Sequence, residues 1–251
     1  MDAWTLLVPI GLVVARISGF VTVLPIFGSG LVPAFIRVGL VLVLSMFTLA
    51  TRWSATVLFQ TEVHWMVAVL GTVQEVSLGV GLGLCIRLIF TAVHQGGCIF
   101  AQAIGLTDAG VIDPVSGEES SSLAEFLEII FTLFFLVAGG HQLLLAILFR
   151  SYDWFPLGSY PGAGVLAGAV MEASVIMLTM AVQLAAPVLG GFLILAAVLA
   201  VLARVMPDMN ILFESYPLRV GVGYLMAIGV VGALNGFVAQ VMAWMRQFLT
   251  V

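Results

Sequence analysis

The chain has 251 residues, of which 62% are hydrophobic and 8% are charged, and its formal net charge is −5. Soluble domains carry about 25% charged residues, so this composition excludes an ordinary water-soluble globule and predicts an integral membrane protein built from apolar helices. Every basic residue is an arginine, and the arginines are scattered along the chain. Without a basic patch, the chain is not expected to bind nucleic acid.

Long apolar runs are the main signal for secondary structure. A helix that spans a membrane needs about 20 apolar residues. One run is short for a span, and the third and fifth are long enough to tilt, bend or form hairpins. Five to eight helical segments are therefore predicted, in a single membrane domain over residues 1–251. The runs are 3–26, 32–50, 63–93, 126–149, 163–203 and 218–249.

Prolines and glycines interrupt two of these runs. Pro25 and Pro33 flank a stretch that also contains Gly28 and Gly30, and such a stretch does not form a continuous helix. In the fifth run, Pro187 is followed by two glycines and is the expected break. Broken helices are therefore predicted at both places.

The longest hydrophilic stretch is predicted to be a loop at about residues 105–122. Its glycines give the backbone freedom, its proline limits regular structure, and its carboxylates favour water over lipid. The residues that define it are Gly105, Asp108, Gly110, Asp113, Pro114, Gly117, Glu118 and Glu119.

Small residues recur at a spacing that lets helix backbones approach closely in a membrane. With 27 glycines in the chain, some of these pairs arise by chance, so the spacing alone does not settle which pairs lie at helix contacts. The Gly-x-x-x-Gly pairs are Gly79 with Gly83, Gly164 with Gly168, and Gly232 with Gly236.

Four ionisable residues fall inside apolar runs: Arg16, Glu75, Arg87 and Glu172. Such residues cost about 2.5–3.5 kcal/mol on insertion scales, and they usually face protein or water. Arg16 is therefore expected to pair with a carboxylate or with carbonyl groups at a helix end.

A polar stripe is predicted on the fifth apolar run. Glu172, Thr179 and Gln183 stand at positions i, i+7 and i+11, which places Thr179 and Gln183 each within roughly 20° of Glu172 on a helix. The stripe fits either a polar contact buried between helices or the lining of a pore or proton path, and the spacing leaves both open.

No arrangement typical of catalysis is found. His64, His94 and His141 are far apart and lack metal-ligand spacing, so each is expected to be a partnered or interfacial histidine. Ser29 and Ser116 lack the Gly-x-Ser-Gly form of intramembrane proteases, and no phosphate-binding or dinucleotide motif is present. The chain is therefore expected to be no enzyme and to hold no cofactor or metal.

Short motifs follow one another along nearly the whole chain. They are Arg16-Ile17-Ser18-Gly19, Pro25-Ile26-Phe27-Gly28, Val32-Pro33 with Arg37, Gln102-Ala103-Ile104-Gly105-Leu106, Ile112-Asp113-Pro114-Val115-Ser116-Gly117, Gly140-His141, Phe155-Pro156-Leu157-Gly158, Ala203-Arg204-Val205-Met206-Pro207-Asp208-Met209-Asn210-Ile211, and Tyr216-Pro217-Leu218-Arg219-Val220-Gly221. This ordered set resembles the FliR family of flagellar type III export-gate proteins, although Arg219 stands where most members are expected to have Lys.

The resemblance implies an all-α protein of stacked helical hairpins with broken helices, much of it lifted out of the lipid plane. FliR-like proteins join FliP-like and FliQ-like subunits, with FlhB-like and FlhA-like gate proteins, in the flagellar basal body of the bacterial inner membrane. Unfolded flagellar proteins are the cargo, and the proton motive force and a separate ATPase supply the energy. The loop at 105–122 matches one that lies inside the channel as a plug.

Two other functions stay open. The homologous subunit of virulence type III secretion systems, SctT/SpaR/YscT, shares the family pattern, although the run 217–223 favours the flagellar branch. A secondary transporter of small solutes would use the breaks at 25–33 and 187–191 to bind its substrate near the middle of the membrane.

Overall fold

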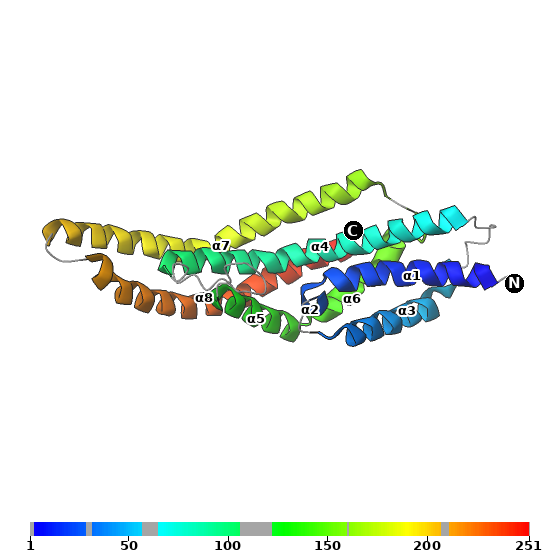
Figure 1. Cartoon of the computed structure of the whole chain (residues 1–251), viewed down its shortest axis with the longest axis horizontal. Coiled ribbons are helices and arrows are strands. Elements are labelled where there is room, and N and C mark those ends of the chain that lie inside the picture. The colour runs from blue at the N-terminus through cyan, green and yellow to red at the C-terminus, as the bar shows by residue number, and fades with distance from the viewer. Residues whose placement is uncertain are drawn as a thin grey trace. The chain divides into compact units, whose positions relative to one another are not determined.

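The computed structural model describes residues 3–28, 32–56, 65–105, 122–159, 161–206 and 211–250. Within these ranges the regular elements are all helices, which confirms the all-α prediction (Figure 1). The helices are α1 (Ala3–Val23), α2 (Pro25–Gly28), α3 (Ala34–Thr56), α4 (Trp65–Ile104), α5 (Ser122–Val137), α6 (Gly140–Trp154), α7 (Ala163–Val205) and α8 (Ile211–Thr250).

Several of the described helices are long and apolar enough to cross a membrane. Four qualify alone, α5 and α6 taken together would make a fifth, and α1 adds a shorter apolar helix over Leu7–Val23. At 1.5 Å per residue, the 43 residues of α7 have a length of about 65 Å measured along the helix, roughly twice the thickness of a hydrocarbon core. The four segments are Ala34–Thr51, Trp65–Ile104, Ala163–Val205 and Ser215–Gln247.

The predicted break at Pro187 is wrong, because α7 continues through this residue. A proline removes one backbone N–H, and long helical stretches on both sides keep the other hydrogen bonds. The apolar run 126–149 is interrupted instead, since α5 ends at Val137 and α6 begins at Gly140. Gly139 has φ +83°, a left-handed conformation that suits glycine and ends a helix.

The segment between α1 and α3 is not one continuous helix, and its prolines stand at helix starts. Pro25 is the first residue of α2, and Pro33 directly precedes the first residue of α3. A helix start tolerates proline because the first N–H groups of a helix have no partner within it. Arg37 steadies the start of α3 by donating from Nη2 to the carbonyl oxygen of Val32 at 3.1 Å. Gly30 lies outside the described residues.

The chain separates into two compact units. Unit 1 comprises residues 1–88, 141–175 and 245–251, and unit 2 comprises residues 89–140 and 176–244. Helices α4, α7 and α8 contribute to both. The single membrane domain over residues 1–251 stays a prediction.

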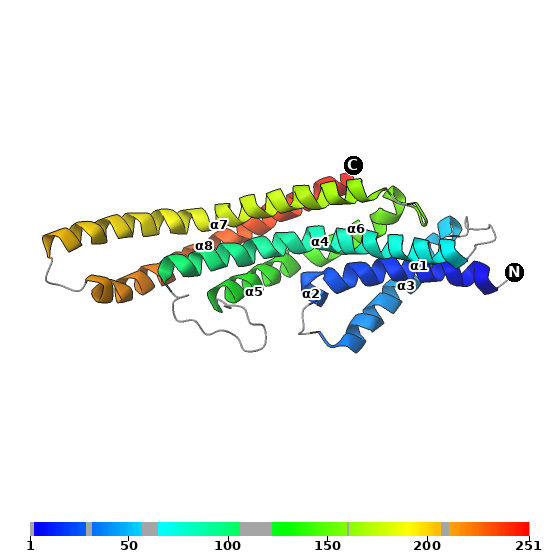
Figure 2. The same ribbon diagram turned by 45° about the horizontal axis from the view of Figure 1, so that its top comes forward.

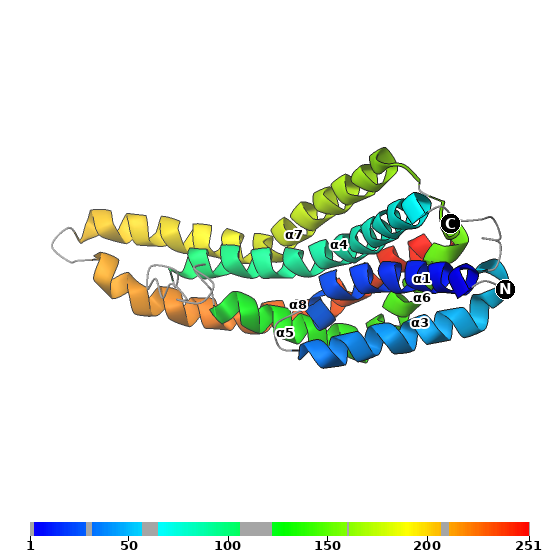
Figure 3. The same ribbon diagram turned by 45° about the vertical axis from the view of Figure 1, so that its right-hand side comes forward.

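In unit 1, α1 lies against α3 on one side and against the first part of α4 on the other (Figures 1 and 3). The contact with α4 is close because glycines form it. A Cβ atom at Gly19 would lie 2.7 Å from the carbonyl oxygen of Val76, and one at Gly83 would lie 3.0 Å from that of Phe20. A Cβ atom at Gly79 would collide with the carbonyl group of Arg16. The pair Gly79 and Gly83 therefore lies at a helix contact.

The other two glycine pairs do not lie at contacts of this kind. Added Cβ atoms at Gly164, Gly168, Gly232 and Gly236 would meet no heavy atom within 4 Å among the described residues. The same spacing therefore forms a contact between two helices of this chain at Gly79 and Gly83, whereas the glycines of the other two pairs contact no other described helix.

In unit 2, α5 lies beside α4 (Figure 2), and side chains of α4, α5 and α8 form an aromatic core. The ring centroid of Phe131 lies 5.1 Å from that of Phe90 and 5.8 Å from that of Phe237, both nearly edge-on. Phe135 also packs edge-on against Phe90 at 5.2 Å. Such pairs each contribute about 0.5–1.5 kcal/mol beyond the burial of their area.

Candidate functional site: a buried arginine between three helices

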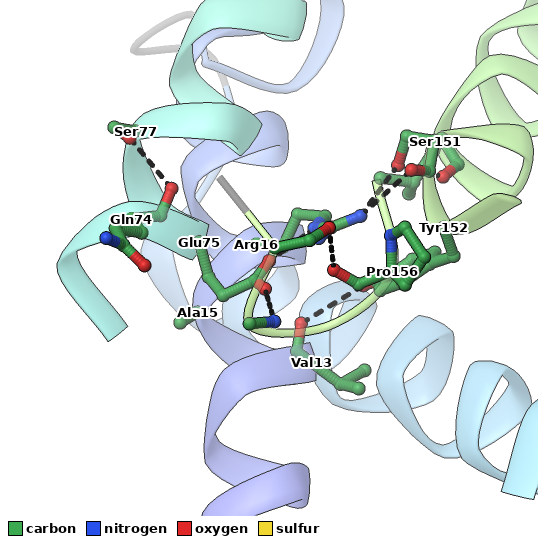
Figure 4. Close-up of polar contacts among 12 residues, drawn as sticks. Val13, Ala15, Arg16, Gln74, Glu75, Ser77, Ser151, Tyr152 and Pro156 are labelled. Atoms are coloured by element: carbon green, nitrogen blue, oxygen red, sulfur yellow. Dashed lines mark hydrogen bonds and ion pairs between the residues drawn. The ribbon is translucent and has the colours of Figure 1, made fainter. Parts of the chain in front are cut away.

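Arg16 of α1 and Glu75 of α4 form an ion pair inside unit 1 (Figure 4). Their side chains are 0% and 1% exposed, and Arg16 Nε donates to Glu75 Oε2 at 2.5 Å. The pairing of Arg16 with a carboxylate, expected from the sequence, is confirmed. The sequence singles out Glu75 independently of Arg16, and the structure brings the two together.

Helix α6 and the turn after it complete the cluster. Arg16 Nη1 donates to the carbonyl oxygen of Ser151 at 3.1 Å, and its Cζ lies 4.3 Å from the ring centroid of Tyr152. The second carboxylate oxygen, Glu75 Oε1, accepts a hydrogen bond from the backbone N–H of Gly158 at 3.0 Å. The ion pair therefore joins α1, α4, α6 and the turn that follows α6.

The local sequence explains why these groups meet. Arg16 belongs to the buried side of α1, where buried residues recur three or four positions apart: Leu12, Val13, Arg16, Ile17 and Phe20. On α4, Glu75 precedes Gly79 and Gly83 by four and eight residues, so all three share one face. Because the glycines admit the backbone of α1, its arginine reaches the carboxylate. Gly158 has φ +78°, which favours glycine in the turn that donates to Glu75.

The cluster is suited to holding helices together. Removing one partner of a buried ion pair costs about 3–5 kcal/mol, because the other charge is left without compensation. Tyr152 adds a cation–π contact and places its Oη 3.5 Å from the carbonyl oxygen of Val13. Within the described residues, no group of three His, Cys, Asp or Glu side chains is placed to hold a metal ion.

The other predicted intramembrane polar residues lie at the surface. Arg87, Glu172, Thr179 and Gln183 are all exposed. Gln183 lines a cavity of about 530 Å³ between α7 and α8, with Pro187, Gly229 and Gln240 among its other lining residues. The two predicted roles of the stripe formed by Glu172, Thr179 and Gln183, a contact with another helix or the lining of a pore or proton path, both remain predictions.

The histidines differ in their surroundings. The Nδ1 atom of His94 in α4 lies 2.9 Å from the Oε2 atom of Glu128 in α5, and both side chains are about one third exposed. His141 is exposed, and His64 lies outside the described residues. Glu128 was not among the residues that the sequence singled out for a site.

The predicted plug loop falls almost wholly outside the described residues. Gly105 follows the last residue of α4 and has φ +86°, again a conformation that favours glycine. The remaining residues of the set lie outside the described part of the chain: Asp108, Gly110, Asp113, Pro114, Gly117, Glu118 and Glu119.

Sequence reasoning missed the α6 side of the cluster. Ser151 contributes a backbone carbonyl, and Tyr152 contributes a ring, so neither follows a pattern of residue types. Gly158 was part of a recognised motif, Phe155-Pro156-Leu157-Gly158, but nothing there indicated that its N–H would meet a carboxylate.

A comparison with known protein families assigns the chain to one of them. Residues 7–245 match the model of the family described as bacterial export proteins, family 1. The chain belongs to this family. The matched range includes Arg16, Glu75, the α6 side of their cluster and the hydrophilic loop.

The chain is also similar to individual proteins named as flagellar biosynthetic proteins and as surface presentation of antigens proteins. The chain is 29% identical to the flagellar biosynthetic protein FliR of Bacillus subtilis, over 86% of this chain and 83% of the relative. It is 30% identical to that of Aquifex aeolicus, over 85% and 81%. The surface presentation of antigens protein SpaR of Shigella sonnei is 32% identical, over 55% of this chain and 53% of the relative.

Proposed function

We propose that the chain is a subunit of a flagellar type III export gate in the bacterial inner membrane. The observation that carries this proposal is its similarity to flagellar relatives over more than four fifths of its length. The virulence relative matches a shorter part of the chain. Four helices long and apolar enough to cross a membrane support a membrane component.

In this proposal the chain assembles with FliP-like and FliQ-like subunits, near FlhB-like and FlhA-like gate proteins, and unfolded flagellar proteins pass through the complex. Extensive exposed apolar surface supports assembly in a membrane. Leu193, Ile194 and Val205 of α7, for example, are 74%, 67% and 72% exposed. Surface of this kind is suited to lipid or to other apolar helices.

Deletion of the gene in its own bacterium tests the proposal. Flagellar proteins should disappear from the culture medium, motility should be lost, and a plasmid copy should restore both. A tagged copy extracted in mild detergent should co-purify with the other gate subunits. Normal flagellar export with loss of virulence secretion would favour the SpaR-like function instead, and a defect in solute uptake alone would favour a transporter.

The hydrophilic loop at 105–122 is proposed as the plug that closes the channel. A gate that passes an unfolded chain must hold back ions when idle, and a hydrophilic, glycine-containing segment between two apolar helices suits that role. Deleting residues 107–119 should leave assembly intact but let ions and small solutes leak, which slows growth when the gate is overproduced. Normal membrane conductance in an assembled deletion complex would show that the loop is only a connector.

A further inference from the structure

Two helices of unit 1 carry the same pattern: one carboxylate and two glycines at intervals of four residues. Four residues make just over one helical turn, so the members of each set lie along one face of their helix. The sets are Glu75, Gly79 and Gly83 on α4 and, in the opposite order, Gly164, Gly168 and Glu172 on α7.

The set on α4 is occupied by α1. The glycines let the backbone of α1 come so close that a methyl group at Gly79 would collide with the carbonyl group of Arg16. The arginine of the approaching helix then pairs with the carboxylate, Glu75. Close backbone approach and compensation of the carboxylate are thus achieved by one neighbouring helix.

The set on α7 has no such neighbour among the described residues. Cβ atoms added at Gly164 and Gly168 would meet nothing within 4 Å. Glu172 is exposed and makes no hydrogen bond or ion pair within the part of the chain that the structure describes. A different face of α7 packs on α4, where Leu166 lies against Gly81.

Neither lipid nor water suits this outer face of α7. Glu172 stands nine residues into the helix, about 13 Å from its start, and a carboxylate that deep in an apolar helix is costly against lipid. Its neighbours on the face are large and apolar: Val165 is 58% exposed and Val175 is 60% exposed. Apolar side chains exposed to that extent are poorly suited to an aqueous channel wall. A protein helix that brings a cation satisfies both requirements.

A two-fold symmetric dimer of this chain does not fit the face. A two-fold symmetric contact would bring the same patch of each copy together. The two Glu172 carboxylates would then face each other, which adds a repulsion instead of removing one. The occupant must therefore carry the opposite charge.

We propose that Gly164, Gly168, Glu172 and Val175 form the docking surface for a membrane-embedded helix of a different export-gate subunit, with an arginine or lysine opposite Glu172. The inference rests on the proposed function, because it takes the partner from the same gate. It assigns this face of α7 the role that the Glu75 face of α4 has inside the chain.

Purification of the gate from its own cells tests the inference. In tagged chains, Glu172→Lys and Gly168→Leu should each lower the yield of co-purifying gate subunits at least tenfold, with normal amounts of the chain in the membrane. Ala169→Leu is the matched control, because it places the same leucine side chain at an exposed position 100° around the helix from Gly168. It should leave the yield unchanged. Reversing the charge of the facing cation in the partner should restore assembly with Glu172→Lys.

A labelling experiment keeps the test decisive if a variant fails to fold. In a chain with Cys85→Ser and Cys98→Ser, the cysteine of Val175→Cys should react with maleimide when the chain is expressed alone and be protected in the assembled gate. Labelling by a water-soluble maleimide in the assembled gate would indicate a channel wall and overturn the inference. A normal yield with Glu172→Lys and Gly168→Leu would overturn it too, while leaving the proposed function intact. Absence of gate subunits from the wild-type preparation would instead overturn the proposed function.

Discussion

Glu75 and Glu172 are both carboxylates within long apolar helices of unit 1, yet their surroundings are opposite. Glu75 is buried and has an arginine, a backbone N–H and a glycine-lined contact around it. Glu172 is exposed on α7, beside glycines that meet nothing within 4 Å in the described chain. The first carboxylate is compensated when this chain folds, whereas the second needs compensation from outside.

The comparison separates two physical roles for the same residue types. A buried ion pair whose partners come from one chain determines how that chain's own helices meet. A carboxylate on an outer apolar face instead favours an assembled state, because assembly supplies the missing partner. Substitutions at the two places should therefore affect different steps, folding in one case and assembly in the other.

The largest effect is expected from Arg16→Ala. It leaves Glu75 buried without a cation and removes the contacts to Ser151 and Tyr152, which should cost about 3–5 kcal/mol. The amount of assembled complex and swimming motility should both fall to near background. Arg150→Ala, at an exposed arginine, is the control and should behave as wild type. Wild-type assembly with Arg16→Ala would show that the pair is dispensable.

A smaller effect is expected from Gly79→Ala, which tests the glycine contact beside Glu75. The added methyl group collides with the carbonyl group of Arg16, so α1 must shift at a cost of about 1–3 kcal/mol. The thermal midpoint of the extracted complex should fall. Gly39→Ala on α3 is the control, since its Cβ would meet nothing within 4 Å and should leave the midpoint unchanged or slightly raised. Equal midpoints for the two variants would contradict close packing at Gly79.

The smallest effect is expected from replacing both charges at once, as Arg16→Met with Glu75→Leu. Apolar side chains of similar size leave no uncompensated charge, and such replacements of buried pairs are often neutral. The double variant should therefore assemble better than either single variant in a double-mutant cycle. If the losses simply add, Arg16 and Glu75 act independently and the ion pair is not the reason for their effect.

The helical architecture could be predicted because apolar runs of 20 residues or more have few alternatives in a membrane. Positions of the breaks were harder to predict. Pro187 lies in a helix whose other hydrogen bonds hold it together, whereas Gly139 ends α5 through a left-handed conformation that the sequence does not reveal. A lone proline was therefore a weaker signal for a break than a glycine after a helix.

Arg16 and Glu75 could each be predicted as a special residue, because an ionisable side chain in an apolar run needs a partner. Their pairing and the α6 contacts could not be predicted. They depend on how segments far apart in the sequence meet, and Ser151 and Gly158 take part through backbone atoms, which every residue has. The sequence shows which charged residues need a partner, but the partner of each one depends on how the helices pack.

The most direct test compares Glu75→Gln with Glu172→Gln in two settings: the chain alone in membranes that lack the other gate genes, and the assembled gate. Protease resistance of the chain alone should fall with Glu75→Gln and stay at the wild-type level with Glu172→Gln. In cells with all gate subunits, both substitutions should lower the yield of the complex. A loss of resistance with Glu172→Gln in the chain alone, or none with Glu75→Gln, would contradict the division between internal and external compensation.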